Sequence, residues 1–243
     1  MSSYVALVIG CTGAVGRELV SELVSSTKCT KVIALARRDV PKSAWKSTFP
    51  SLDVNTAKRK LEVRRVDFNH LSETDIQSEE KVVAAFSCLG TTRKDAGSAE
   101  AFRKGREDRG YAFVRLDNIY VVGTVDLEYV LKFAEVCKMA SVPYFGLLTS
   151  QGADKDSWFL YPQTKGEVEA KVQQLGFQRT SIFRPGMLER GELQRNTEKV
   201  LGWMLPGKFV ISVRAVAKGM VFDFESNGEG LKEWSHAELK RFE

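Results

Sequence analysis

Three residues in the second half of the chain could perform chemistry together: Ser150, Tyr161 and Lys165. A tyrosine and a lysine four positions apart lie on the same face of a helix, so the Lys165 ammonium can stabilise the phenolate of Tyr161. A tyrosine in this setting can exchange a proton with a carbonyl or an alcohol, and the Ser150 hydroxyl can hydrogen-bond the same oxygen. The pattern YxxxK is common by chance on helix surfaces. Its position behind a predicted strand and a Thr-Ser pair favours the catalytic interpretation.

A glycine-rich turn near the N-terminus has the spacing of a phosphate-binding loop. It directly follows the apolar run 5–9 and opens an amphipathic stretch of helix length. In such a unit the first glycine permits a tight turn and the second lets backbone N–H groups approach a pyrophosphate. The third allows close packing of the helix on the strand. A simple packing turn is the alternative, because a glycine triplet alone is weak evidence. The sequence predicts dinucleotide contacts at Gly10, Thr12, Gly13, Ala14, Val15 and Gly16.

Two arginines indicate which dinucleotide this loop would take. Arg37 lies 21 positions after Gly16, where an enzyme that uses NAD would hold the ribose 2′-hydroxyl with an acidic residue. Here Arg37 and Arg38 come first, and Asp39 follows them. Guanidinium groups form charge-assisted hydrogen bonds to a 2′-phosphate, so the pair predicts NADP(H) as the cofactor. The alternative is a solvated basic turn.

Short apolar runs alternate with helix-length amphipathic stretches, which is typical of a parallel sheet with crossover helices. The fold class predicted is α/β, a Rossmann-type doubly wound parallel sheet, as one domain over residues 1–243 with its core at 4–187. We expect a small C-terminal cap from 188–243, in which 208–224 forms a lid helix or, less favourably, a membrane-surface helix. The elements expected are strands at 5–9, 31–36, 61–66 (near an edge), 82–89, 144–148 and 180–183, and helices at 15–25, 127–139, 162–175 and near 197–205.

Further stretches of the sequence form a recognisable pattern: SCLGTTR at 87–93, LLTSQGADK at 147–155, FLY at 159–161, KGEVEAKV at 165–172 and FRPG at 183–186. This pattern resembles the short-chain dehydrogenase/reductase superfamily, and more closely its atypical branch typified by the Tat-interactive protein, a metastasis-suppressor oxidoreductase. The resemblance covers most of residues 5–187, whereas the last fifty-odd residues match only loosely.

The resemblance implies an NADP(H)-binding Rossmann domain with an assigned catalytic set. Tyr161 would exchange the proton, Lys165 would hold the nicotinamide ribose, and Ser150 would orient the carbonyl. The superfamily's asparagine helper has no clear counterpart, and its role is not transferred to Asn118. Cofactor contacts implied beyond the glycine loop are Tyr161, Lys165, Leu89, Gly90, Thr91, Arg184, Pro185, Gly186 and Leu188. At 184–186 the backbone would meet the carboxamide end of the cofactor.

Three features depart from the family pattern. Pro162 follows the tyrosine directly, and a proline biases the residue before it away from helical angles, although it is tolerated in a first helical turn. Gln151 stands where relatives often carry lysine. Residues 105–124 interrupt the pattern as an unusual insert, either an unspliced intron or a genuine surface loop. In both cases the insert would lie near the cofactor.

Two functions follow from these residues. The first is an oxidoreductase that moves hydride between NADP(H) and a small carbonyl or alcohol. The second is a redox-sensing regulator or adaptor that binds NADP(H) without significant turnover, because members of the resembled family are described as interaction proteins as often as enzymes. A sugar-nucleotide epimerase or dehydratase is disfavoured, since only 57 residues follow Gly186 to build a substrate domain.

Composition narrows the remaining classes. The chain has 243 residues and a net charge of +5, with acids and bases interspersed, which does not favour a nucleic-acid partner. Four scattered cysteines do not form a disulfide scaffold, and two histidines do not favour a metal site. No apolar stretch approaches the ~18–20 residues of a spanning helix. Because a strand-like run begins at Tyr4, we expect no leader. We expect a cytoplasmic protein, with a nuclear or peripheral membrane location as alternatives. The resemblance also implies protein partners as in that family, and we expect a homodimer.

Overall fold

A seven-stranded parallel sheet forms the centre of the molecule. The computed structural model describes residues 3–90, 127–189 and 210–243. The strand order is β3-β2-β1-β4-β5-β6-β9, and every neighbouring pair is parallel. The strands are β1 (Tyr4–Ile9), β2 (Cys29–Ala36), β3 (Leu61–Arg65), β4 (Val82–Ser87), β5 (Tyr144–Leu148), β6 (Arg179–Arg184) and β9 (Gly230–Ser235).

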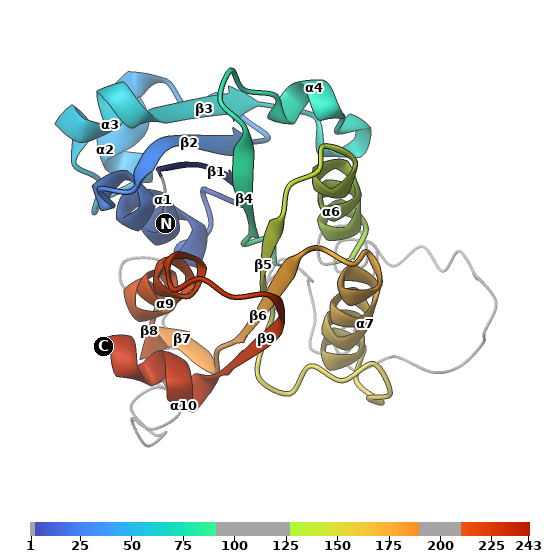
Figure 1. Ribbon diagram of the computed structural model, residues 1–243. Helices are drawn as coiled ribbons and strands as arrows, with labels where there is room; N and C mark the ends of the chain where they lie inside the picture. The colour runs from blue at the N-terminus through green and yellow to red at the C-terminus, as the bar shows by residue number, and fades with distance from the viewer. Residues whose placement is uncertain (1–2, 91–126, 190–209) are drawn as a thin grey trace.

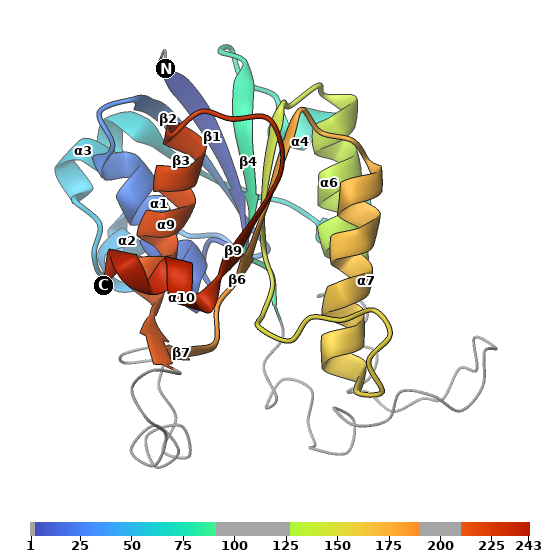
Figure 2. The same ribbon diagram turned by 60° about the horizontal axis from the view of Figure 1, so that its bottom comes forward.

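Helices cover both faces of this sheet, as Figures 1 and 2 show from two directions. One face carries α1 (Ala14–Ser25) and α9 (Val213–Glu225), and the other carries α6 (Tyr129–Met139) and α7 (Leu160–Gln174). Shorter elements connect the strands: η1 (Lys42–Ala44), α2 (Trp45–Thr48), α3 (Val54–Lys60), η2 (Phe68–His70) and α4 (Glu73–Ile76). After the last strand, α10 (His236–Leu239) and η6 (Lys240–Phe242) end the chain.

Strand β1 shows why the chain folds this way. All six of its residues are buried, and successive side chains point to opposite faces. Val8 joins the hydrophobic core under α1, whereas Leu7 joins the core under α6. A strand that is apolar on both faces is stable only when helices cover both, which is the arrangement of a doubly wound fold.

The order of strands places a crevice beside β1. From β1 the chain proceeds to β2 and β3 on one side, then crosses to β4 on the other side of β1. Ligands of doubly wound folds bind at the carboxyl ends of the strands where the order reverses in this way. The predicted fold class, the six expected strands and the edge position of the third are confirmed.

The C-terminal part differs from the sequence prediction. Of the run 208–224, the residues that the structure describes form neither a lid nor a membrane-surface helix. Instead α9 lies against α1, buries eight of its residues and links to α1 through the Arg214–Glu22 ion pair (2.8 Å). After α9, strand β9 pairs with β6 and completes the sheet. Residues 213–243 therefore belong to the central sheet and its helical layer.

A second, two-stranded sheet lies after β6. It pairs β7 (Met187–Glu189) with β8 (Val210–Ser212) in parallel. The insert at 105–124, the helix expected near 197–205 and Thr91 fall outside the described residues. Within the described ranges no helix is long and apolar enough to cross a membrane, and no three potential metal ligands cluster.

Candidate active site

Two glycines of the loop after β1 are required by close backbone packing. Gly10 adopts a φ of +75°, and a Cβ built there would lie 2.6 Å from the carbonyl carbon of Cys88. A Cβ on Gly16 would lie 2.1 Å from the Gly10 carbonyl oxygen. Real Cβ atoms do not approach other atoms so closely, so both positions admit only glycine. They bring the first turn of α1 directly onto the end of β1.

Gly13 differs from the other two glycines. A Cβ there would lie 3.3 Å from the Gly10 carbonyl oxygen, a tight but much less severe contact. Gly13 is the N-cap of α1, no side chain caps the helix, and no acidic residue occupies its first turn. The N–H groups and positive dipole end of α1 are thus available for an anion at this point.

The loop forms one wall of a cavity of about 490 Å³ at the carboxyl ends of β1, β2 and β4. The structure brings together here seven of the predicted cofactor residues: Gly10, Thr12, Gly13, Arg37, Arg38, Leu89 and Gly90. They come from three segments far apart in the sequence. The structure therefore places these three segments around one cavity.

Seven lining residues were not predicted as cofactor contacts: Leu35, Ala36, Asp39, Val40, Thr48, Phe68 and Cys88. Phe68 is buried just after the carboxyl end of β3, and the Arg37 guanidinium lies 6.0 Å from the centroid of its ring. Its position after the third strand, at the same edge of the sheet as the glycine loop, is the signal that could have found it. Thr48 lies on the short helix α2 and carries no such signal.

Two arginines give the cavity a positive charge, and the thiol of Cys11 in the adjoining glycine loop is buried. Arg37 and Arg38 are exposed, while Asp39 forms an ion pair with Arg65 (3.4 Å). Cys11 donates a hydrogen bond to the Leu35 carbonyl (3.2 Å), and burial raises the pKa of its thiol to about 12. Cys11 is therefore a small neutral group at neutral pH, and the arginines dominate the local field.

Three predicted cofactor residues lie within α1 and behave differently from the loop. Val15 is 3% exposed and packs in the hydrophobic core, so its side chain faces the sheet. Gly16 contacts the Gly10 carbonyl as described above. Ala14 is the first residue of α1 and is half-buried at the edge of the same core.

Tyr161 and Lys165 lie on the first turns of α7. The helix begins at Leu160, so Pro162 occupies its first turn, where a missing N–H is tolerated. The departure expected from Pro162 therefore does not separate the pair. The Lys165 ammonium nitrogen lies 5.8 Å from the centroid of the Tyr161 ring. Lys165 is only 2% exposed, whereas Tyr161 is half-buried.

Ser150 is held at the carboxyl edge of the sheet. The residues on either side of it continue the pairing of β5 with β6: the Thr149 N–H donates to the Phe183 carbonyl (2.8 Å), and the Gln151 N–H donates to the Pro185 carbonyl (2.8 Å). The segment that carries Ser150 therefore follows the sheet past the end of β5. It then enters the loop 152–159 that leads to α7.

This loop packs tightly on α7 because of Gly166. A Cβ on Gly166 would lie 2.0 Å from the Lys155 backbone nitrogen, and the Asp154 N–H donates to the Pro162 carbonyl (3.0 Å). Gly166 directly follows Lys165, so the loop after Ser150 is fixed beside the predicted catalytic pair. Sequence reasoning had assigned no role to this glycine, whose position in a helix interior is a recognisable signal of close packing.

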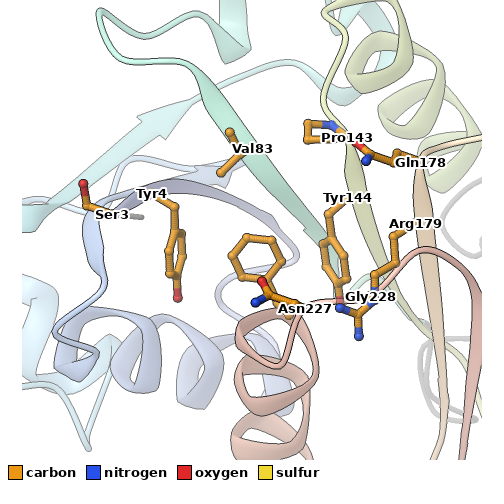
Figure 3. Close-up of a pocket in the computed structure, with 10 residues that line it drawn as sticks. Ser3, Tyr4, Val83, Pro143, Tyr144, Gln178, Arg179, Asn227 and Gly228 are labelled. Carbon is orange, nitrogen blue, oxygen red and sulfur yellow. The ribbon is translucent and has the colours of Figure 1, made fainter. Parts of the chain in front are cut away.

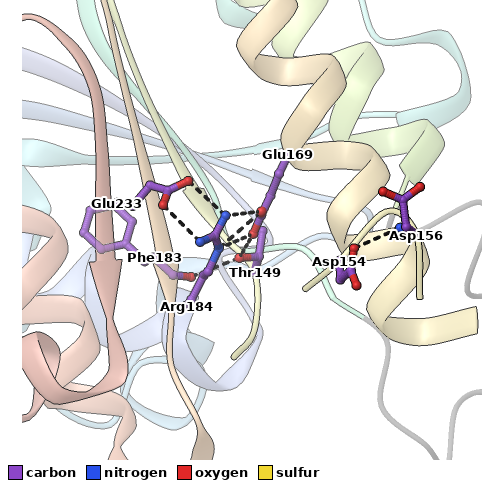
Figure 4. A network of polar contacts seen from close by, with 7 residues as sticks. All are labelled: Thr149, Asp154, Asp156, Glu169, Phe183, Arg184 and Glu233. Atoms are coloured by element: carbon purple, nitrogen blue, oxygen red, sulfur yellow. Dashed lines mark hydrogen bonds and ion pairs between the residues drawn. The ribbon is translucent and has the colours of Figure 1, made fainter. Parts of the chain in front are cut away.

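The resemblance assigns the cofactor contact at Arg184 to its backbone, and the side chain of Arg184 is engaged elsewhere. Its guanidinium lies between two carboxylates: Nη2 donates to Glu169 Oε2 (2.7 Å) and to Glu233 Oε1 (2.9 Å) (Figure 4). Hydrogen bonds to Glu169 are the main cause that raises the pKa of Arg184. The side chain is thus committed to ion pairs between α7, β6 and β9.

Gly186 and Leu188 also make contacts within the protein. The Gly186 N–H donates to His236 Nδ1 (3.0 Å), at the start of α10. Leu188 lies in β7, where it is half-buried against the core under α1.

A second cavity, of about 260 Å³, lies at the opposite end of the strands, where β1, β5 and β6 begin (Figure 3). Tyr4 and Tyr144 line it together with Arg179, whose Nη2 donates to Asp223 Oδ1 (2.6 Å). The same carboxylate accepts hydrogen bonds from Tyr144 (2.9 Å) and Trp234 (2.8 Å). These bonds satisfy a buried ion pair of the core, and the predicted chemistry lies at the other edge.

A parallel sheet of this order, with a glycine loop after its first strand and a Ser-Tyr-Lys set after its fifth, defines the short-chain dehydrogenase/reductase class. Solved structures support this fold. A short-chain dehydrogenase/reductase from Serratia marcescens superposes with a TM-score of 0.68 over 98% of both chains at 13% identity. A UDP-glucuronic acid 4-epimerase from Bacillus cereus superposes with a TM-score of 0.67 over 95% of this chain and 76% of that one, at 14% identity.

Sequence comparison is more specific. Protein HTATIP2 of Rattus norvegicus is 35% identical over 242 residues, which cover 96% of this chain and 86% of the relative. The chain belongs to the HTATIP2 family. Protein fmp52, mitochondrial, of Emericella nidulans is 31% identical over 181 residues, 74% of this chain and 65% of that protein. A comparison with models of protein families finds none that matches the chain.

Proposed function

We propose that this protein binds NADP(H) and transfers hydride between it and a small carbonyl or alcohol. The observation that carries the proposal is the cavity in which the glycine loop, Arg37, Arg38 and the end of β4 meet. Within the same fold, the Bacillus cereus epimerase was solved in complex with UDP-glucuronic acid and NAD. A dinucleotide in this chain would take the corresponding place at the carboxyl edge.

The residues of the cavity fit the adenosine and phosphate half of such a cofactor. Gly10 and Gly13 leave room for a pyrophosphate against the uncapped N-terminus of α1. Arg37 and Arg38 would hold the 2′-phosphate, and Leu89 and Gly90 would line the path from the end of β4 towards α7. When bound, the cofactor supplies or accepts the hydride.

The protein's own residues would bind the substrate oxygen and transfer its proton. Tyr161 Oη would donate a proton to the carbonyl oxygen in reduction, or accept it in oxidation. The buried Lys165 ammonium would favour the phenolate and hold the ribose hydroxyls. Ser150 Oγ would donate a hydrogen bond that fixes the carbonyl, and its segment is held by the backbone bonds of Thr149 and Gln151.

A preference for NADP(H) follows from the two arginines. Each charge-assisted hydrogen bond contributes about 1.5–3 kcal/mol, and about 1.4 kcal/mol is a tenfold change in affinity. One such bond made only to the 2′-phosphate is enough for a tenfold preference over NAD(H). Asp39 does not oppose this strongly, because Arg65 neutralises part of its charge.

Calorimetric titration of the 243-residue chain with NADPH, and with NADH as the control, tests the cofactor. We expect tight binding of NADPH and at least about tenfold weaker binding of NADH. Equal affinities would refute the role of the arginines. A folded chain that binds neither nucleotide would refute the proposed function.

A second candidate function is an NADP(H)-dependent regulator that docks a protein partner. It is favoured by two neighbouring exposed aromatic residues just before Tyr161: Trp158 is 69% and Phe159 is 55% exposed. The variant Tyr161→Phe separates the two functions. An oxidoreductase loses turnover with aldehydes or ketones while it keeps NADPH affinity. A regulator shows no turnover in either form.

The compartment and assembly are proposals as well. We propose a cytoplasmic protein that forms a homodimer, and a mitochondrial location is the alternative because the fmp52 relative carries that word in its name. Cell fractionation with a C-terminal tag would separate the compartments. Light scattering during size exclusion would give the mass of the assembly.

A further inference from the structure

A buried carboxylate lies directly beside the proposed catalytic residues. Glu169 follows Lys165 by four positions, as Lys165 follows Tyr161, so the three share one face of α7. Glu169 is 4% exposed, although an isolated carboxylate is costly to bury. The hydrogen bonds of the Glu169 carboxylate therefore indicate its structural role.

The Glu169 carboxylate ties α7 to the ends of two strands (Figure 4). Oε1 accepts from Thr149 Oγ1 (2.6 Å) and Arg184 Nε (3.0 Å), and Oε2 accepts from Arg184 Nη2 (2.7 Å). Thr149 immediately precedes Ser150, and Arg184 is the last residue of β6. A single side chain thus joins the segment of Ser150 to the helix of Tyr161 and Lys165.

A third element braces this junction. Arg184 also donates to both oxygens of Glu233 on β9, at 3.1 Å and 2.9 Å. The guanidinium is held from two sides in a planar fork, which fixes its orientation more strongly than one pair would. Its fixed orientation in turn defines where the Glu169 carboxylate must lie.

We propose that Glu169, oriented by Arg184 and bonded to Thr149, is a positioning residue that sets the distance between Ser150 and the Tyr161–Lys165 pair. The inference rests on the proposed oxidoreductase function. Reacting groups must be placed to a fraction of an ångström, and a misplacement of about 1 Å costs on the order of a hundredfold in rate. We call the bonded set Thr149, Glu169 and Arg184 the clamp. The clamp affects the geometry of the catalytic residues, and its hydrogen bonds involve neither the glycine loop nor Arg37 and Arg38.

Thr149→Val tests the clamp with a nearly isosteric change, and Thr149→Ser restores the hydroxyl. Tyr144→Phe is the matched control, because it also removes one buried hydroxyl-to-carboxylate bond, to Asp223 at the opposite edge of the sheet. For a carbonyl substrate of the wild type, Thr149→Val should lower kcat by roughly tenfold to a hundredfold. The Kd for NADPH should stay within about twofold, and Thr149→Ser and Tyr144→Phe should keep near wild-type kcat.

Hydrogen–deuterium exchange provides a readout that needs no turnover. In Thr149→Val the amides of 149–166 should exchange faster, with those of 4–40 unchanged, whereas Tyr144→Phe should leave 149–166 unchanged. An unchanged exchange at 149–166, or a kcat within about twofold of wild type, overturns the clamp. A wild type that binds NADPH but reduces no carbonyl refutes the proposed function instead, and the exchange data then decide the clamp alone.

Discussion

The Gly10 carbonyl oxygen lies where any side chain on Gly16 would have to begin: a Cβ on Gly16 would come within 2.1 Å of it. This contact joins the turn after β1 to the first turn of α1. It separates the functions of the three glycines, because Gly16 is needed for packing whereas Gly13 faces the cavity. The glycines of this loop therefore serve two different purposes, backbone packing and access to the cavity.

The first prediction uses this difference. Gly16→Ala should destabilise the protein by at least about 1–3 kcal/mol, since backbone on both sides cannot yield. Gly13→Ala should unfold close to wild type in urea but lose affinity for NADPH, because its methyl group would intrude on the phosphate position. Denaturant unfolding and calorimetry on both variants measure the two effects. Equal behaviour of the two variants would contradict the assignment.

A second prediction concerns cofactor selectivity. Replacing both Arg37 and Arg38 by Ser should raise the Kd for NADPH by at least about tenfold and leave that for NADH nearly unchanged. The reason is that only NADPH carries the 2′-phosphate. Arg241→Ser, which removes an exposed arginine near the C-terminus, is the control for loss of a surface arginine outside the cavity and should change neither Kd. A parallel loss of both affinities in the double variant would point to a general electrostatic effect.

The third prediction concerns Gly166. Its missing Cβ allows the backbone of Asp154 and Lys155 to pack on α7, so Gly166→Ala should push that loop away and lower kcat as well as thermal stability. Gly219→Ala is a matched helical control, because the nearest atom to its Cβ is a side-chain carbon of Leu239 at 2.8 Å, which can move. A smaller loss in Gly166→Ala than in Gly219→Ala would show that the loop is not fixed there.

A fourth prediction follows from the buried thiols. Burial is the main cause that raises the pKa of Cys11 and of Cys29 to about 12, whereas an unfolded thiol titrates near about 8.5. Between these values the native state keeps protons that the unfolded chain loses. The free energy of unfolding should therefore be unaffected below about pH 8 and fall above it, by up to about 1.4 kcal/mol per pH unit for each such thiol.

Urea unfolding at about pH 8 and about pH 9.5 measures this slope before unfolded tyrosines titrate near about 10. Cys29→Ala should reduce the slope, since it removes one titrating thiol. A stability that rises with pH across this window, or an equal slope in the variant, would contradict the prediction.

Much of the molecule was predictable from the sequence because local patterns carried the information. Strands β1 and β5 are fully buried and mostly apolar, as is typical of strands inside a parallel sheet. The glycine loop and Arg37 depend on short spacings along one βαβ unit, so their convergence at one edge follows from the topology. The same reasoning placed Tyr161 and Lys165 on one helix face.

Strand β9 and helix α9 show what the sequence alone could not specify. Gly230–Ser235 is an edge strand with Trp234 as its single buried residue, so it lacks the apolar run that marks strands such as β1. Helix α9 has a pattern that fits a lid as well as a core helix, and only its packing on α1 decides between them. The pairing of β9 with β6 and the packing of α9 on α1 both depend on which apolar surfaces and strand edges remain exposed once the rest of the chain has folded.

The assignment of Arg184 and Glu169 was likewise decided by tertiary structure. Arg184 lies 15 positions from Glu169 and 49 from Glu233, and no local spacing relates the three. The sequence by itself determined six strands of the central sheet, the glycine loop and the helix that carries Tyr161 and Lys165, because each depends on neighbours within one or two turns. Tertiary structure decided which charged groups form buried ion pairs. An unpaired charge is costly to bury, and only groups that folding brings together can pair.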